Sequence, residues 1–307
     1  MRDQPTLHAP GHVYEVAIIG AGIAGCEAAW HCARAGVDVL LVTTSLDTLY
    51  NLLGDKVALD PPEDTLMARV LADLQGSAQP SKQNGVGNGG VGNRGVGNRG
   101  VGNRGVGNRV SNGVVGNWAF HRRAKTLLET ETSIHLLQSN VTALVCKEPQ
   151  SQQHQSEEPQ SQKETRQQAQ KQVTGVRTWE GVDRLAKRTA LCVGSFLHAR
   201  LTIGTLTEVA GRLSEMAYDD LADNLLEHGL TLRDAYLKAS FNDSSLPYQV
   251  ACQVLDDSDG YQLAGFVGLY AAGVCQRGYL PFEEAALEGK RLADQLIHAS
   301  QASDTAH

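Results

Sequence analysis

The sequence predicts an α/β fold, a doubly wound parallel sheet of the Rossmann type, and three observations lead to this prediction. An apolar run of strand length at 16–19 comes directly before the glycine pattern G-A-G-I-A-G at 20–25. A helix of small residues follows through Ala35, with Gly36 suited to end it. A second apolar run at 37–42 then restores the strand pattern. Strand, glycine turn, helix and strand in this order form one unit of such a sheet.

The glycine turn predicts a dinucleotide site. Gly20, Gly22 and Gly25 have the spacing G-x-G-x-x-G. The first permits a tight turn, the second lets the backbone approach a pyrophosphate, and the third lets the helix pack close to the strand. Free N–H groups and the helix dipole then favour a diphosphate. The alternative is a glycine-rich turn without a ligand.

The end of the second predicted strand departs from an ordinary NAD site. An acidic residue usually binds the adenosine ribose about 20 residues after the glycine turn. This chain has Thr43 and Thr44 at that place. We therefore expect their hydroxyl groups to take over that role.

The remaining pattern continues the α/β alternation. We expect a helix with Glu63 and Asp64 in its first turn and an apolar stripe over 66–74, and further helices at 118–130, 216–228 and 282–299. Strands are expected at 134–137, 141–145, 173–178, 183–187, 189–193 and 267–272. The strands from 141 to 187 have the spacing of a β-meander. Residues 230–265 allow no assignment.

Two low-complexity segments interrupt this pattern, a Gly-Val-Gly-Asn-Arg repeat in 76–117 and a Gln/Glu-rich stretch at 148–172. Neither composition can form a core, so we expect both to be disordered inserts. The ordered part would then be one discontinuous domain, 14–75 with 118–299, followed by a tail at 300–307. The repeat either contacts RNA or is an expanded surface loop; its arginines are Arg94, Arg99, Arg104 and Arg109.

Composition excludes several classes of protein. The net charge of −7 argues against a broad nucleic-acid-binding surface. Six cysteines without a C-x-x-C pair fit a reducing, cytoplasmic environment. No apolar run is long enough for a membrane span. His121 and His198 have no partner at ligand spacing, so we expect no metal site.

Four stretches resemble the MnmG (GidA) family of FAD-dependent tRNA-modifying proteins, and more closely its short GidA-related flavoproteins. They are G-A-G-I-A-G-C-E-A-A at 20–29 with L-L-V-T-T-S-L-D-T at 40–48; Q-S-N-V-T-A-L at 138–144; A-L-C-V-G-S-F-L-H-A-R-L-T-I-G at 190–204; and G-L-Y-A-A-G at 268–273 with F-E-E-A-A-L-E-G at 282–289. The resemblance implies a glutathione-reductase-like, Rossmann-type FAD-binding domain with a β-meander.

The resemblance also implies which residues bind FAD. Residues of the glycine turn would hold the pyrophosphate: Gly20, Ala21, Gly22, Ile23, Ala24 and Gly25. Thr43 and Thr44 would lie near the ribose, and Val141 near the adenine. Gly194, Gly273 and Val274 would approach the cofactor, the last two at its ribityl–flavin end. The final helix, starting at Phe282 and Glu283, would direct its positive dipole end at the flavin N1/C2 side, where it stabilises the anionic reduced ring.

The implied function is an FAD-binding oxidoreductase related to tRNA wobble-uridine modification. Hydride would pass through flavin N5, with NAD(P)H as electron donor and tRNA or a tRNA-modifying protein as partner. The departures from the family are also informative, because no cysteine lies between Cys32 and Cys146 and only Cys252 lies at 230–268. By the resemblance, we expect the family's nicotinamide-site insertion and C-terminal helical domain to have no counterpart in this sequence. We therefore expect the chain to lack the full tRNA-modifying machinery.

Two alternatives stay open at this point. The chain could be a non-catalytic flavin-binding scaffold or partner module. An NAD-dependent dehydrogenase without flavin is disfavoured, because a plain Rossmann domain does not need the terminal strand and helix. The residues suspected of chemistry are Cys275, a redox thiol or a structural one, and Arg212 and Arg277, anion clamps or surface charges.

Overall fold

The computed structural model describes residues 8–9, 11–76, 114–147, 170–239, 247–256 and 260–304. Most of the two predicted inserts, including the whole arginine-containing repeat, lies outside the described residues. Their predicted disorder, and the domain limits that depend on it, stay predictions.

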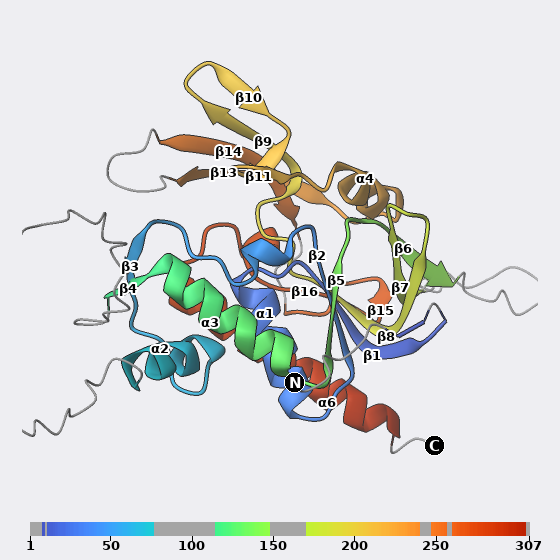
Figure 1. Cartoon of the computed structure of the whole chain (residues 1–307). Helices are drawn as coiled ribbons and strands as arrows, with labels where there is room; N and C mark the ends of the chain where they lie inside the picture. The colour runs from blue at the N-terminus through green and yellow to red at the C-terminus, as the bar shows by residue number, and fades with distance from the viewer. Residues whose placement is uncertain are drawn as a thin grey trace, which may run out of the picture.

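The central layer is a parallel sheet, which confirms the predicted Rossmann-type fold (Figure 1). Its parallel strands run in the order β16-β8-β1-β2-β5, with β1 pairing both β2 and β8. Their bounds are β1 Val13–Ile19, β2 Val39–Thr43, β5 Ile134–Gln138, β8 Asp183–Leu191 and β16 Leu269–Ala271. The meander joins at the β8 side through antiparallel β7 (Lys171–Thr178) and β6 (Val141–Lys147), and short β15 (Phe266–Val267) pairs β7.

The two faces of this sheet contribute to different cores, because alternate side chains of a strand point to opposite sides. Val16 and Ile18 of β1 pack toward the helices, whereas Ala17 and Ile19 pack toward the meander. Burial on both faces explains why residues 16–19 of β1 and 39–42 of β2 are continuously apolar rather than alternating.

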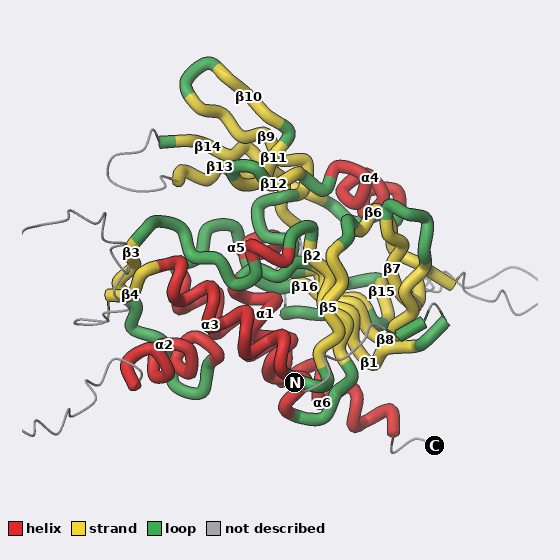
Figure 2. Tube along the Cα trace, in the orientation of Figure 1, coloured by secondary structure: helices red, strands yellow, loops and turns green. Residues whose placement is uncertain are grey.

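Helices α1 (Ile23–Arg34), α2 (Leu66–Gly76), α3 (Asn117–Thr130) and α6 (Phe282–Asp304) lie together on one side of the sheet (Figure 2). The predicted apolar stripe of α2 is buried: Leu66, Met67, Val70, Leu71 and Leu74. Helices α1 and α6 are in close contact, since a Cβ atom on Gly289 would lie 2.3 Å from the carbonyl oxygen of Ala24. Only glycine allows this approach.

A buried carboxylate joins α1 to α2. Glu27 of α1 is fully buried and accepts hydrogen bonds from the backbone N–H groups of Leu66 (2.8 Å) and Met67 (2.9 Å) and from the hydroxyl of Tyr50 (2.5 Å). The first N–H groups of a helix have no partner within that helix. Glu27 therefore caps α2 from a different element.

A second, four-stranded antiparallel sheet lies over the end of the first, in the order β10-β9-β14-β13 (Figure 1). Its strands are β9 Leu197–Ile203, β10 Leu206–Glu208, β13 Leu232–Ala239 and β14 Tyr248–Leu255. The sequence analysis made no assignment for β13 and β14 and assigned no strand to β9. Shorter elements complete the fold: η1 Leu46–Thr48, β3 Lys56–Ala58, β4 Val114–Gly116, β11 Ala210–Arg212, β12 Glu215–Met216, α4 Asp219–Glu227 and α5 Val274–Arg277.

Helix α2 begins at Leu66 and not in the predicted first turn at Glu63 and Asp64, because the φ of +58° at Asp64 is not helical. Four further differences from the predicted boundaries have a clear structural cause. The strands predicted at 183–187 and 189–193 form one strand, because β1 pairs β8 without a break. The helix predicted from 216 begins at Asp219, because Met216 pairs with Ala210 in β11–β12. The strand predicted at 267–272 divides at Gly268, whose φ of +79° interrupts it.

The fourth difference is the end of the last helix. Helix α6 continues to Asp304, through part of the predicted tail. The guanidinium of Arg188 in β8 donates hydrogen bonds to the hydroxyl of Ser300 (3.2 Å) and to the carbonyl of Ala299. This contact holds the last turns of α6 against the sheet.

Candidate functional site

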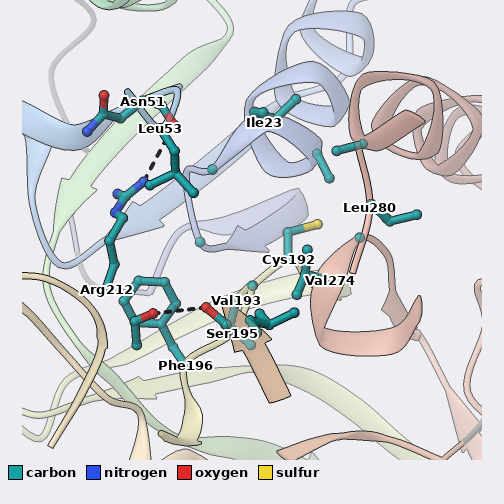
Figure 3. A pocket seen from close by; sticks show the side chains of 18 of the residues that line it. Ile23, Asn51, Leu53, Cys192, Val193, Ser195, Phe196, Arg212, Val274 and Leu280 are labelled. Atoms are coloured by element: carbon teal, nitrogen blue, oxygen red, sulfur yellow. Dashed lines mark hydrogen bonds between the residues drawn. The ribbon is translucent and has the colours of Figure 1, made fainter. Parts of the chain in front are cut away.

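A cavity of about 460 Å³ lies at the carboxyl end of the parallel strands. Parallel α/β sheets bind their ligands at this edge, and the volume is in the range of cofactor and substrate pockets. The walls come from the glycine turn, the ends of β2 and β8, the segment leading into α6, and the second sheet. Figure 3 shows this cavity from close by, with Ile23, Arg212 and Val274 on different walls.

The glycine turn has the shape that a diphosphate requires. A Cβ atom on Gly25 would lie 1.9 Å from the carbonyl oxygen of Gly20, so that only glycine allows α1 to pack this close. A Cβ atom on Gly22 would meet nothing within 4 Å, and it would face the cavity. Gly22 is also the N-cap of α1, and no side chain caps that end. The first N–H groups of α1 are therefore available to a ligand.

The two threonines at the end of β2 both line the cavity. The Thr43 hydroxyl donates to the carbonyl of Ser45 (3.2 Å) and accepts from the N–H of Ser45 (3.4 Å). The Thr44 hydroxyl is hydrogen-bonded to the buried hydroxyl of Tyr218. Both threonines thus lie where a ligand in the cavity could contact them, through the backbone or through the hydroxyl groups. Their role at the ribose stays a prediction.

One wall carries ionic side chains that are already paired. Arg212 forms an ion pair with Glu215, and its guanidinium also donates to the carbonyl of Asn51 at 3.5 Å (Figure 3). Glu215 accepts in addition from the hydroxyl of Thr48 at 3.3 Å. The charge of Arg212 is thus largely compensated by Glu215. Arg212 therefore holds the segment at Asn51 in place rather than offering a free positive charge to an anionic ligand. Arg277 lies away from the cavity lining and pairs with Glu288 at 3.1 Å.

The wall beside the glycine turn is the segment from β16 to α6, where a Cβ atom on Gly273 would lie 3.0 Å from the Cβ of Ala24. Gly273, Val274, Phe282 and Glu283 line the cavity, and the Glu283 carboxylate accepts from the N–H of Asp60 at 3.2 Å. The first turn of α6 therefore faces the same cavity as the first turn of α1. Tyr279, 74% exposed, lies at the rim.

The structure gathers most of the predicted cofactor residues around this cavity. Those in its lining are Gly20, Ala21, Gly22, Ile23, Ala24, Thr43, Thr44, Gly194, Gly273, Val274, Phe282 and Glu283. Gly25 lies beneath the turn, where it packs α1 on Gly20. Val141 is fully buried in the core formed with the meander, outside the lining, and its contact with adenine stays a prediction.

Cys275 is also outside the lining. Its thiol is fully buried and donates to the carbonyl oxygens of Leu191 and Ala272, both at 3.3 Å. Burial raises the pKa of the Cys275 thiol to about 12. A nucleophilic thiolate is the species that reacts, and this environment suppresses it.

We expect native Cys275 to resist alkylation by iodoacetamide at pH 8, because its thiol stays protonated well above that pH. Cys146 should react first, since among the cysteines of the described segments it alone is not fully buried. Peptide mass spectrometry after timed labelling measures both rates, and labelling in denaturant gives the reference. Equal native rates at Cys146 and Cys275 would contradict the burial argument.

Sequence reasoning missed the wall that the second sheet provides: Leu237, Lys238, Tyr248 and Val250. A usable signal was present in β14, whose residues Y-Q-V-A-C-Q-V-L alternate in burial over most of the strand. The exposed Lys238 adds an unassigned positive charge to the cavity mouth.

The family is decided by comparison with known proteins. The model of the family described as glucose inhibited division protein A, GidA, matches residues 15–56 and 95–250, more than half of the chain. The chain belongs to the GidA family. This confirms the resemblance seen in the sequence.

Solved GidA structures share the fold. The GidA-related protein from Thermus thermophilus superposes with a TM-score of 0.66 at 30% identity, covering 94% of this chain and 100% of its own. Aquifex aeolicus GidA superposes with a TM-score of 0.65 at 13% identity, over 94% of this chain and 64% of its own. The second likeness shows the fold alone.

Curated GidA-family relatives are much longer than the matched region. The tRNA uridine 5-carboxymethylaminomethyl modification enzyme MnmG of Chlamydia caviae is 26% identical over 254 residues, 83% of this chain and 36% of the relative. MnmG 1 of Fusobacterium nucleatum is 25% identical over 219 residues, 71% of this chain and 32% of the relative. The chain thus spans about a third of the length of these relatives. Within the parts of the chain that the structure describes, no helix has both the length and the apolar character needed to cross a bilayer.

Proposed function

We propose that this GidA-family protein binds FAD in the cavity and acts as an FAD-dependent oxidoreductase. The observation that supports this most is the uncapped start of α1 at Gly22, open to a cavity that extends to the start of α6. FAD has a diphosphate in its middle and, at one end, a ring that becomes anionic on reduction, and a positive dipole end favours both. The two helix starts provide such ends.

The residues present fit the diphosphate, a ribose, the ribityl chain and the ring of FAD. The backbone N–H groups of Gly22, Ile23 and Ala24 would hold the diphosphate, and the end of β2 at Thr43 and Thr44 would contact the ribose. Gly273 and Val274 would approach the ribityl chain, and the first turn of α6 would orient the ring. When bound, the flavin supplies the hydride-accepting centre. Apolar side chains in the lining would keep water from the flavin; they include Val193, Phe196, Val250, Leu280 and Pro281.

We further propose NAD(P)H as electron donor and a tRNA or a tRNA-modifying protein as partner. The printed activity of the relatives, tRNA uridine modification, supports the tRNA class. Covalent work on a uridine would need a reactive thiol. Of the described residues lining the cavity, Cys192 is the only cysteine, and burial raises the pKa of its thiol well above the ordinary value. We therefore propose a redox role without the full modification reaction. Six free cysteines also support a cytoplasmic location.

Purified full-length protein is expected to carry FAD and to lose its visible flavin absorption when NADH or NADPH is added under anaerobic conditions. FAD is identified by chromatography after denaturation of the protein. Absence of flavin after reconstitution with excess FAD would overturn the cofactor proposal. Bound FAD that neither nicotinamide reduces, but dithionite does, would instead overturn the choice of donor. A control variant for this experiment is Glu227→Ala, because Glu227 is exposed at the end of α4 and outside the cavity lining; it should carry FAD like the unmodified protein.

A further inference from the structure

Three imidazoles and one carboxylate meet at the edge of the sheet opposite the cavity. His12 precedes β1, Asp38 precedes β2, and His135 is the second residue of β5. Because β1, β2 and β5 are parallel neighbours, their amino-terminal ends lie at one edge. His8, from the segment before β1, stacks on His12 with a ring separation of 3.9 Å.

The geometry centres on Asp38. Its two carboxylate oxygens lie 2.7 Å from His12 Nε2 and 3.2 Å from His135 Nε2. The ring of His8 lies 4.4 Å from that of His135. One ligand atom each from His8, Asp38 and His135 can be chosen so that all three lie within 4.8 Å of one another. In a tetrahedral site with bonds of 2.0–2.1 Å, ligand atoms are roughly 3.4 Å apart. Small side-chain rotations would bring the set to that spacing.

We propose that His8, Asp38 and His135 form a binding site for a divalent transition-metal ion of the Zn²⁺ class. His12 lies beside the site, hydrogen-bonded to Asp38. Imidazole nitrogens with one carboxylate suit Zn²⁺, Co²⁺ or Ni²⁺, whereas Mg²⁺ and Ca²⁺ require oxygen ligands. Three separate chain segments supply the cluster, the one before β1 and those that carry Asp38 and His135, so no single stretch of sequence contains the site. The spacing of His8 and His12 was a partial signal, but the expectation of no metal site rested on His121 and His198 alone.

The surroundings support a bound cation at this place. His135 is buried, and the side chain of Tyr14 packs against the rings of His8, His12 and His135 at centroid distances of 4.7–5.8 Å, which holds the imidazoles together. The guanidinium of Arg184 donates to the carbonyl of His8 at 3.3 Å, which fixes the segment that carries His8; its positive charge itself opposes a cation and does not count as support. Within the described residues, Asp38 is the carboxylate in direct contact with the imidazoles. A metal would tie the segment before β1 to the starts of β2 and β5, which gives the site a stabilising role independent of the flavin.

The test uses full-length protein freed of metal with EDTA and titrated with ZnCl₂. At a hundredfold excess over Kd we expect Tm to rise by about 5–10 °C. Titration with CoCl₂ should produce visible absorption bands typical of four-coordinate Co²⁺. Isothermal calorimetry should give a stoichiometry near one. Flavin content should not change, because the cluster and the cavity lie at opposite edges.

Three variants remove ligands, and one is a matched control. Asp38→Asn and His135→Gln should weaken Zn²⁺ binding by about 10–100-fold or more. His8→Gln removes an exposed ligand without disturbing the core, so it tests the site even where the buried His135 variant folds poorly. His298→Gln, exposed on α6 outside the cluster, should bind like the unmodified chain.

Two outcomes would overturn the proposal. One is the absence of a Zn²⁺-dependent rise in Tm together with the absence of the Co²⁺ bands. The other is equal Zn²⁺ affinity in the Asp38→Asn, His8→Gln and His298→Gln variants. Either would mean that the cluster is a hydrogen-bonded imidazole–carboxylate network and no more.

Discussion

The Gly22→Ala variant is expected to fold normally and to bind FAD at least about 100-fold more weakly, a loss of roughly 2.7 kcal/mol. Gly22 has a φ of −72°, which any residue adopts, and a Cβ atom there would meet no protein atom within 4 Å. The added methyl group would occupy the space that the diphosphate needs. Flavin content after purification and a fluorescence titration with FAD measure the effect, and circular dichroism checks the fold.

Two further glycines separate cofactor loss from misfolding. At Gly76, the last residue of α2, a Cβ atom also meets nothing within 4 Å, and this position lies outside the cavity lining. Gly76→Ala should therefore leave both FAD binding and stability unchanged. Gly25→Ala should lower stability, because its Cβ would lie 1.9 Å from the Gly20 carbonyl oxygen. A Gly22→Ala protein with the normal flavin content would show that no diphosphate passes over this glycine.

The Glu27→Ala variant is expected to lose about 3–5 kcal/mol of unfolding free energy. The change leaves the N–H groups of Leu66 and Met67 and the hydroxyl of Tyr50 without their acceptor in a buried place. Burial and the neighbouring Glu27 carboxylate raise the pKa of Tyr50 well above its ordinary value, so that the phenol stays a hydrogen-bond donor. Urea unfolding of the FAD-free protein, followed by circular dichroism, gives the free energy.

Glu27→Gln should cost less than Glu27→Ala, because the amide keeps one acceptor oxygen of the same shape. The matched control is Glu227→Ala, exposed at the end of α4, for which we expect a change within about 0.5 kcal/mol. If Glu27→Ala and Glu227→Ala unfold at the same urea concentration, the buried carboxylate does not stabilise the α1–α2 junction.

Local sequence patterns were sufficient for the parts of the fold that depend on near neighbours. The apolar run before Gly20, the glycine spacing and the small residues of α1 predicted the first β–α–β unit with its ligand-facing turn. The stripe from Leu66 to Leu74 predicted the buried face of α2. Predicted boundaries were wrong where pairing or packing with another element decides them. Met216 pairs with Ala210 in a short local hairpin, and Ser300 contacts Arg188, which is distant in the sequence.

The candidate site likewise has parts that local sequence patterns predicted and parts that they did not. Its glycine turn and the start of α6 were identified from motifs and from the family resemblance. Lys238 and Tyr248 of the second sheet were not, because residues 230–265 contain no motif and their strands are defined by pairing with each other and with β9.

By itself, then, the sequence determined the Rossmann-type unit, the family and most of the proposed cofactor contacts, since each depends on residue types at short, regular spacing. Only the tertiary structure decided that Glu27 caps α2, that the second sheet closes the cavity, and that His8, His12, Asp38 and His135 meet. These contacts join segments far apart in the chain. The order of strands in the sheet brings them together, and no local pattern contains that order.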